Sequence, residues 1–293
     1  MTTASESRPG SARASQRTGG RQVLTRVGLL AVHDTGPRCA GGEVIALWPS
    51  VLADHRIYEP LIEAWRGRHR VVVVDGPGHG DSGPAPRPFT MADCAHAVGE
   101  VLDALGVAQP VVVGGTSWGG LVAGEFALVA PGRTRAVVML NTPVHTAPGG
   151  PGPGDRFVVW GARWLTSLGL YRDGVARAFF LPATRSRGGV AMEAFQRHLR
   201  HADGAALALA VRSVLLEREP LAPRMRGIQA PTLFVVGRHD AMYPPESLRD
   251  AAATLPRGRF EVLDTAHISV VDAPGPTAAL IDGFLASLGP APR

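Results

Sequence analysis

Short apolar runs and amphipathic segments alternate along most of the chain. The apolar runs are strand-sized, and the segments between them place apolar residues at helical intervals. Strands are predicted at residues 28–36, 41–49, 70–76, 110–115, 135–141, 231–237 and 259–265. Helices are predicted at residues 55–67, 90–106, 120–130, 245–256 and 277–289, and the second begins with Thr90 and Asp93 in capping-box spacing. This order predicts an α/β fold with a doubly wound, mostly parallel sheet.

The alternation stops between residues 144 and 228. A segment rich in Pro and Gly, TAPGGPGPGDR, is followed by four helical patterns with no strand pattern among them, at residues 157–170, 174–180, 190–202 and 204–217. We therefore expect residues 144–228 to be an inserted helical lid. The core is expected at 23–143 and 229–293, and residues 1–22 are expected to be a disordered basic tail.

The charge distribution argues against a nucleic-acid partner. The formal charge of the chain is +5, but five arginines and one glutamate give the first 26 residues a net charge of +4. No basic stripe is therefore expected on the folded part. The apolar runs fall short of the roughly 20 residues that span a bilayer, and the first residues lack an apolar signal core, so we expect no membrane partner and a cytoplasmic location. The composition predicts no oligomeric state.

Cys39 and Cys94 are the only cysteines, and they lie far apart without a CxxC pair. A disulfide framework or a zinc site is therefore not indicated, and no metal is expected.

The stretch VVVGGTSWGG at residues 111–120 places one serine at the corner between a predicted strand and a predicted helix. Gly115 precedes Ser117 by two residues and Gly119 follows it by two, which gives the pattern G-x-S-x-G of a nucleophile elbow. In an open parallel sheet this corner points into the crevice at the carboxyl ends of the strands. A glycine-rich corner can also bind phosphate, but the dinucleotide pattern GxGxxG is absent.

A serine nucleophile needs a base, and the base needs an orienting carboxylate. Asp240 follows the strand TLFVVG, and His267 follows the strand RFEVLDT. Asp264 is an alternative acid, although its position suggests the end of a strand. The order along the chain is Ser117, Asp240, His267.

These motifs resemble those of the α/β-hydrolase-fold enzymes that carry a lid, a group that includes esterases, lactonases, C–C bond hydrolases and perhydrolases. The resemblance covers residues 23–288 and includes DGPGHGDSGP, GTSWGG, GRHDAMYPP and the histidine loop. It implies a catalytic triad of Ser117, Asp240 and His267 that needs no metal or cofactor. Some relatives place the acid after the sixth strand, where this chain has Asn141.

The resemblance implies hydrolysis of a carboxylic ester or lactone of a small, mostly apolar molecule. Hydrolysis of a C–C bond next to a ketone and non-catalytic binding of a small ligand remain alternatives.

One segment departs from the family pattern. Trp48 and Pro49 stand where lid-bearing relatives usually have His-Gly. The family donor to the oxyanion hole is the backbone N–H of the next residue, which is Ser50 here. The second donor is the amide of Trp118.

Aromatic and apolar residues suggest the walls of a substrate pocket. Trp48 and Trp118 are expected to flank the nucleophile, Met242 follows the acid turn, and Trp160 and Trp164 lie on predicted lid helices, as do Phe179 and Phe180. Such walls favour an apolar or aromatic acyl compound. The alternative is that the lid residues pack the lid itself. His145 is expected to be a solvated hinge residue, with pocket lining as the alternative.

Overall fold

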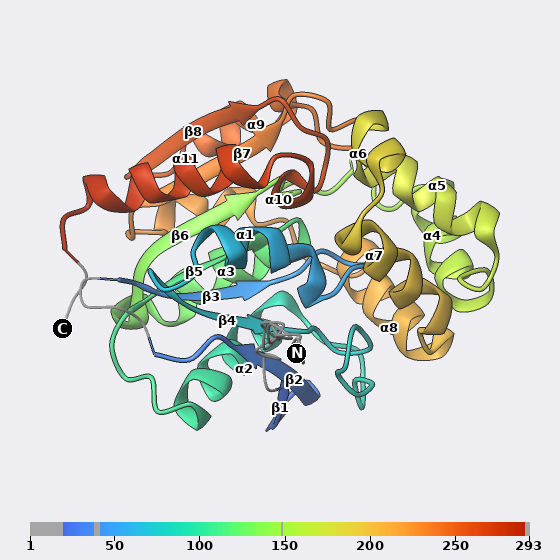
Figure 1. Cartoon of the computed structure of the whole chain (residues 1–293), viewed down its shortest axis with the longest axis horizontal. Coiled ribbons are helices and arrows are strands. Elements are labelled where there is room, and N and C mark those ends of the chain that lie inside the picture. The colour runs from blue at the N-terminus through green and yellow to red at the C-terminus, as the bar shows by residue number, and fades with distance from the viewer. Residues whose placement is uncertain (1–19, 38–41, 148, 291–293) are drawn as a thin grey trace, which may run out of the picture.

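The computed structural model describes residues 20–37, 42–147 and 149–290, and one eight-stranded sheet runs through it. The strand order is β1-β2-β4-β3-β5-β6-β7-β8 (Figure 1). The strands are β1 (Gly20–Thr25), β2 (Gly28–Asp34), β3 (Val44–Trp48), β4 (Arg70–Val74), β5 (Val111–Thr116), β6 (Thr134–Leu140), β7 (Thr232–Gly237) and β8 (Gly258–Leu263). β3 to β8 pair in parallel, and β2 pairs antiparallel with both β1 and β4. The predicted mostly parallel sheet is confirmed.

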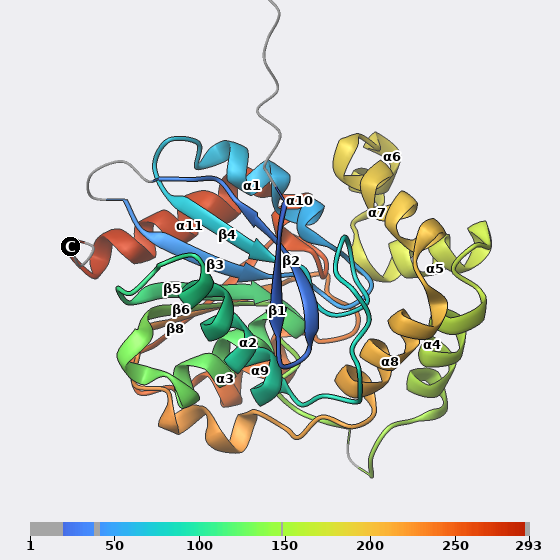
Figure 2. The same ribbon diagram turned by 90° about the horizontal axis from the view of Figure 1, so that it is seen from below.

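Helices cover both faces of the sheet (Figure 2). One face carries α1 (Glu59–Ala64), α10 (Ser269–Asp272) and α11 (Pro274–Ser287), and the other carries α2 (Met91–Ala104), α3 (Trp118–Val129) and α9 (Pro245–Ala252). Three short 3₁₀ helices complete these connections: η1 (His55–Tyr58), η2 (Pro131–Arg133) and η3 (Ala222–Gly227). The predicted capping box of Thr90 and Asp93 starts α2.

Five helices are inserted between β6 and β7. They are α4 (Pro153–Trp164), α5 (Gly169–Phe179), α6 (Pro182–Arg187), α7 (Val190–His201) and α8 (Gly204–Leu215), and we call them the helical insertion. α6 lies outside the predicted helical segments, because it is a short Arg-rich turn without an apolar period. Figure 1 shows β3 and β6 pointing toward the insertion, so it sits beyond the carboxyl ends of the parallel strands.

The beginning of the described chain differs from the sequence prediction. The sequence pattern places residues 20–22 in the tail, but Gly20 begins β1, which pairs with β2 from Gly20 to Thr25. β1 is an edge strand with only Val23 buried, so its sequence lacks the apolar alternation that predicts a strand. Residues 1–19 and Cys39 lie outside the described residues.

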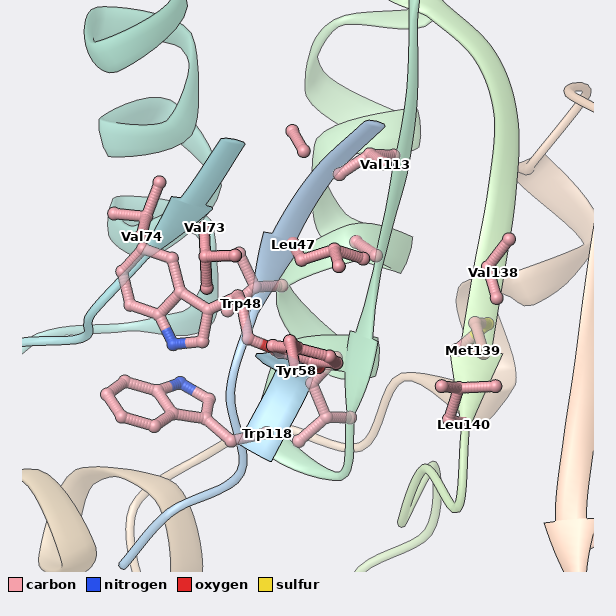
Figure 3. Packing of buried hydrophobic residues seen from close by; sticks show 14 of the residues in the cluster. Leu47, Trp48, Tyr58, Val73, Val74, Val113, Trp118, Val138, Met139 and Leu140 are labelled. Atoms are coloured by element: carbon pink, nitrogen blue, oxygen red, sulfur yellow. The ribbon is translucent and has the colours of Figure 1, made fainter. Parts of the chain in front are cut away.

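The core is dense where β3, β4 and β5 run side by side (Figure 3). Val71 to Val74 are at most 1% exposed, as expected for a parallel strand covered on both faces. The other cysteine, Cys94, is fully buried on α2, and burial raises the pKa of its thiol. Within the described ranges, no helix combines the length and apolar character needed to cross a membrane.

Candidate active site

Ser117 lies at the sharp corner between β5 and α3. Its backbone has φ +57°, a left-handed conformation that costs free energy for a residue with a side chain. The amide of Ser117 donates a hydrogen bond to the carbonyl oxygen of Leu140 at 2.7 Å, which ties the corner to the end of β6. The structure thus builds the strained turn that the sequence pattern predicts.

The glycines around Ser117 allow elements to approach closely. A Cβ at Gly115 or at Gly119 would overlap the backbone oxygen of Trp48. A Cβ at Gly120 would overlap the side chain of Thr142. Small residues are therefore required here so that α3 can lie against the ends of β3 and β6.

Asp240 and His267 come together in the structure. Nδ1 of His267 lies 2.7 Å from Oδ2 of Asp240, and both side chains are 1% exposed. Oδ1 of Asp240 accepts hydrogen bonds from the amides of Met242 at 3.0 Å and Tyr243 at 3.1 Å. A carboxylate held this firmly can fix the orientation and tautomer of the imidazole.

Asn141 is a member of this site that sequence reasoning missed. It directly follows β6 with φ +50°, and its Nδ2 donates to Oδ2 of Asp240 at 3.1 Å. Its Oδ1 accepts a hydrogen bond from Ser269 at 2.6 Å. Its position after the sixth strand is the available signal, because some relatives place the acid there.

The alternative acid, Asp264, points elsewhere. Its side chain is 82% exposed and lies 2.7 Å from Nε2 of His239, on the surface. Asp240 is therefore the carboxylate that reaches His267.

Ser117 and His267 line the same cavity, which has a volume of about 980 Å³ and lies between the sheet ends and the helical insertion. Its walls are largely apolar and include Leu52, Phe179 and Leu248. The ring of Phe179 lies 5.3 Å from that of His267, whereas Phe180 turns away and packs on Phe195. The cavity can enclose a small, mainly apolar molecule next to Ser117.

Several polar side chains lie among these apolar walls. His145 is exposed, as expected for a hinge residue, and it also lines the cavity, as the alternative interpretation held. Arg218 also lines it and donates a hydrogen bond to the carbonyl oxygen of His145 at 2.6 Å. Burial lowers the pKa of Arg218.

Trp48 and Trp118 do not line the cavity, contrary to the sequence expectation. Both are 1% exposed, and their rings meet edge to face with centroids 5.2 Å apart in the core (Figure 3). The ring of Trp118 also stacks on Phe89. Trp48 ends a strand whose side chains are buried against the sheet faces, and Trp118 opens a helix packed on α2, so neither indole projects beyond the strand ends.

The expectation for Trp160 and Trp164 was also wrong. They are 50% and 60% exposed and line a separate hollow on the outside of the insertion. The inner face of α4 is formed by small residues, Gly161 and Ala162, which lets α4 pack closely and leaves the indoles outside. Met242 does line the cavity, as expected.

The loop after β3 carries one predicted oxyanion donor. Ser50 is fully buried and is not among the cavity-lining residues, whereas the next two residues, Val51 and Leu52, line the cavity. Leu52 has φ +64°, and its amide donates a hydrogen bond to Nε2 of His79 at 2.9 Å. His79 thereby anchors the loop that carries Trp48 and Pro49 in place of His-Gly.

Trp118 provides the other predicted donor position, because α3 begins there. The first amides of a helix lack carbonyl partners within the helix and are available to an anion.

A buried network of histidines and carboxylates lies next to the loop that follows β3. Asp75 accepts hydrogen bonds from the amide of His55 at 2.7 Å and from Nδ1 of His55 at 2.8 Å, and His33 lies 3.3 Å away. Burial alone would raise the pKa of Asp75, but the hydrogen bonds from His33 and His55 lower it well below its ordinary range. The imidazoles of His33 and His55 are stacked with centroids 3.4 Å apart and planes 17° apart. The hydrogen bonds between His55 and Asp75 hold η1, which follows the loop after β3, against the end of β4. We therefore interpret this cluster as support for that loop.

The comparisons with known proteins identify the family. The family model for the alpha/beta hydrolase fold matches residues 44–274. The chain is 29% identical over 264 residues to the magnesium-chelatase 30 kDa subunit of Rhodobacter capsulatus, covering 86% of this chain and 89% of that protein. A relative from Azorhizobium caulinodans is 38% identical over 84 residues, and the aligned segment spans only 31% of that protein.

Solved structures show the same fold. An esterase from Thermogutta terrifontis has a TM-score of 0.80 at 23% identity, covering 92% of this chain and 99% of that one. The enol-lactonase from Burkholderia xenovorans LB400 has a TM-score of 0.80 at 24% identity, covering 91% and 100%. The chain belongs to the α/β-hydrolase fold family.

Proposed function

We propose that this protein is a serine hydrolase that cleaves a carboxylic ester or lactone of a small, mostly apolar molecule. The observation that carries the proposal is one arrangement: Ser117 at a strained strand-to-helix corner lines a cavity together with His267, whose Nδ1 is held by Asp240 at 2.7 Å. This supports a catalytic triad of Ser117, Asp240 and His267.

The proposed reaction is acyl transfer to water. With Nδ1 of His267 bonded to Asp240, Nε2 is left to remove the proton from the Ser117 hydroxyl. The Ser117 oxygen then attacks the carbonyl carbon, and the protonated His267 gives its proton to the departing alcohol oxygen. Water, deprotonated by His267, attacks the acyl-enzyme and releases the acid and the free serine.

Two backbone amides are proposed to hold the oxyanion. One belongs to Trp118 at the start of α3, and the other belongs to the loop after β3, at Ser50 as the family pattern implies or at the cavity-lining Val51. Loss of one such donor typically lowers kcat by about 100- to 1000-fold.

The apolar walls and the relatives together support the substrate class. The cavity offers aliphatic and aromatic surface around Ser117, and structural neighbours include an esterase and an enol-lactonase. The two alternatives, cleavage of a C–C bond next to a ketone and ligand binding without turnover, use the same cavity.

A substrate panel tests this proposal. The purified full chain is assayed with aryl esters, lactones and vinylogous diketones, and the Ser117→Ala variant serves as the matched inactive control. We expect turnover of esters or lactones that disappears in the variant. Cleavage of a diketone alone would replace ester hydrolysis by C–C hydrolysis, and tight binding of panel members without turnover would favour the binding function.

A further inference from the structure

Exposed apolar side chains are concentrated on one part of the helical insertion. Phe157, Trp160 and Trp164 on α4 are 56%, 50% and 60% exposed, and Leu168 and Leu170 are 53% and 79% exposed. These five residues, which we call the apolar patch, make up half of the ten large apolar side chains that are exposed in the described part of the chain. Such a concentration marks an interaction site more often than a chance surface.

The patch is not a consequence of poor packing. The other three tryptophans of the chain, Trp48, Trp65 and Trp118, are each 1% exposed, so the exposure of Trp160 and Trp164 is specific to α4. On α4 the spacing of Phe157, Trp160 and Trp164 places one large ring on each successive turn of the same face. The buried residues of α4, Gly161 and Ala162, lie off this face, which borders a hollow shared with Ala208 and Arg212 of α8.

Positive charge lies beside the two tryptophans of the patch. Trp160 and Trp164 share a hollow of about 570 Å³ with Arg156, Arg163 and Arg212, and the guanidinium of Arg163 lies 4.8 Å from the ring centroid of Trp164. The one acidic residue lining this hollow, Glu217, is paired with Arg212 at 2.6 Å. Residues 153–215 hold nine arginines and four acidic residues, a net charge of +5.

Part of the patch also borders the cavity that contains Ser117. Phe157, Leu168 and Leu170 are exposed to solvent and line that cavity at the same time. A surface that covers the patch would therefore meet the mouth of the cavity.

We propose that the apolar patch docks on an anionic lipid surface. Amphipathic helices with Trp, Phe and Leu on one face and Arg beside them lie in the membrane interface, where the rings enter the boundary region and the guanidinium groups meet lipid phosphates. The sequence pattern predicts no membrane partner because its apolar runs are too short to span a bilayer, a criterion that does not test for docking on a membrane surface. Docking by this face would open the apolar cavity toward the lipid.

A second copy of the chain fits this surface less well. In a symmetric dimer the same patch meets itself, which would bring Arg156 and Arg163 of one copy close to those of the other. An anionic bilayer supplies both the apolar phase and the opposite charge.

Vesicle binding tests the proposal. The full chain is mixed with vesicles of phosphatidylcholine, or of phosphatidylcholine with phosphatidylglycerol, and followed by co-sedimentation and tryptophan emission. We expect binding that is stronger to the anionic vesicles and weakened by salt, with a blue shift of emission. The shift would report Trp160 and Trp164, because the other three tryptophans are already buried.

Two sets of variants locate the contact. Trp160→Gln with Trp164→Gln is expected to lower vesicle affinity at least tenfold and to remove the blue shift. Arg156→Gln with Arg163→Gln is expected to remove most of the preference for anionic vesicles. The matched controls are Leu24→Gln, an 80% exposed apolar residue on β1, and Arg226→Gln with Arg257→Gln, which removes the same charge from exposed sites elsewhere.

Binding by Ser117→Ala, which lacks the proposed nucleophile, keeps this test separate from the proposed activity. The proposal is overturned if the protein ignores both vesicle types or if the patch variants bind like the controls. It is also overturned if light scattering shows a dimer that Trp160→Gln with Trp164→Gln dissociates while vesicles remain unbound.

Discussion

Asp240 accepts hydrogen bonds on both carboxylate oxygens, and Asn141 supplies one of them. The sequence places Ser117, Asp240 and His267 at strand ends, which is enough to predict that they meet, because parallel strands end at one edge of the sheet. It does not show that the Nδ2 group of Asn141 lies 3.1 Å from the acid. That contact depends on the φ of +50° at Asn141, which follows from tertiary packing.

The indoles of Trp48 and Trp118 also show that the sequence predicts where the backbone lies better than where a side chain points. Trp118 follows Ser117 directly in sequence and Trp48 pairs with Gly115 on the neighbouring strand, yet their side chains leave the backbone in directions that the sequence pattern does not encode. Backbone proximity to Ser117 was therefore predictable, whereas cavity lining was not.

Because Asn141 and Asp240 are in contact, we predict that a carboxylate at position 141 can partly replace the one at position 240. Asp240→Asn should lower kcat by about 10⁴-fold, because the imidazole loses its orienting charge. Adding Asn141→Asp should raise kcat at least tenfold above that of Asp240→Asn, since the side chain at 141 lies 3.1 Å from the Asp240 oxygen that contacts His267. Steady-state kinetics on the best ester of the panel checks this, and a double variant no more active than Asp240→Asn would contradict it.

At the scale of elements, η1 and the loop after β3 hold the ends of β3 and β5 together. The hydroxyl of Tyr58 donates to the carbonyl oxygen of Trp48 at 2.9 Å and accepts from the amide of Thr116 at 2.9 Å. Burial raises the pKa of Tyr58. Long periodic elements such as α2 were predictable from the sequence. β1, α6 and the link that the Tyr58 hydroxyl makes between β3 and β5, which we call the Tyr58 bridge, were not, because short polar segments take their structure from their neighbours.

Tyr58→Phe is expected to lower the free energy of unfolding by about 1–3 kcal/mol. The substitution keeps the ring and leaves two buried backbone groups, one donor and one acceptor, without their partner. Urea unfolding measures the loss. Tyr171→Phe is the control, because that hydroxyl makes one hydrogen bond at 3.1 Å to Val158 in a partly exposed position. Equal losses in the two variants would argue against the bridge.

At the scale of the whole molecule, charge is divided unevenly between the core and the insertion. The insertion is positive and meets the core through buried polar side chains, including His198 of α7, whose Nδ1 lies 3.5 Å from Asp54. Burial lowers the pKa of His198 to about 4, and burial together with the nearby His198 lowers the pKa of His79 to about 4. Both histidines are therefore neutral in the folded protein at neutral pH.

These lowered pKa values predict acid sensitivity. Unfolded histidine titrates near 6.5, so the folded protein binds fewer protons between about pH 6.5 and 4, and its stability falls as the pH falls through that window. His198→Gln removes one such group and should reduce the loss between about pH 7 and pH 5 by on the order of 1–2 kcal/mol.

Thermal or urea unfolding at the two pH values measures this difference. The raised pKa of the buried Asp54 acts in the opposite direction in both proteins, and because Asp54 and His79 both neighbour His198, the measured difference reports the three groups together. His201→Gln, at the exposed end of the same helix, is the control and should leave the slope unchanged. A His198→Gln slope equal to that of the unmodified protein would contradict the prediction.

We propose that Ser117 is a nucleophile activated by His267 and Asp240. The most direct measurement is treatment of the full chain with a fluorophosphonate probe, followed by mass spectrometry of the labelled peptide. We expect one adduct on Ser117, absent in Ser117→Ala and strongly slowed in His267→Ala. A folded protein that stays unlabelled at Ser117, or that is labelled equally fast without His267, would contradict it.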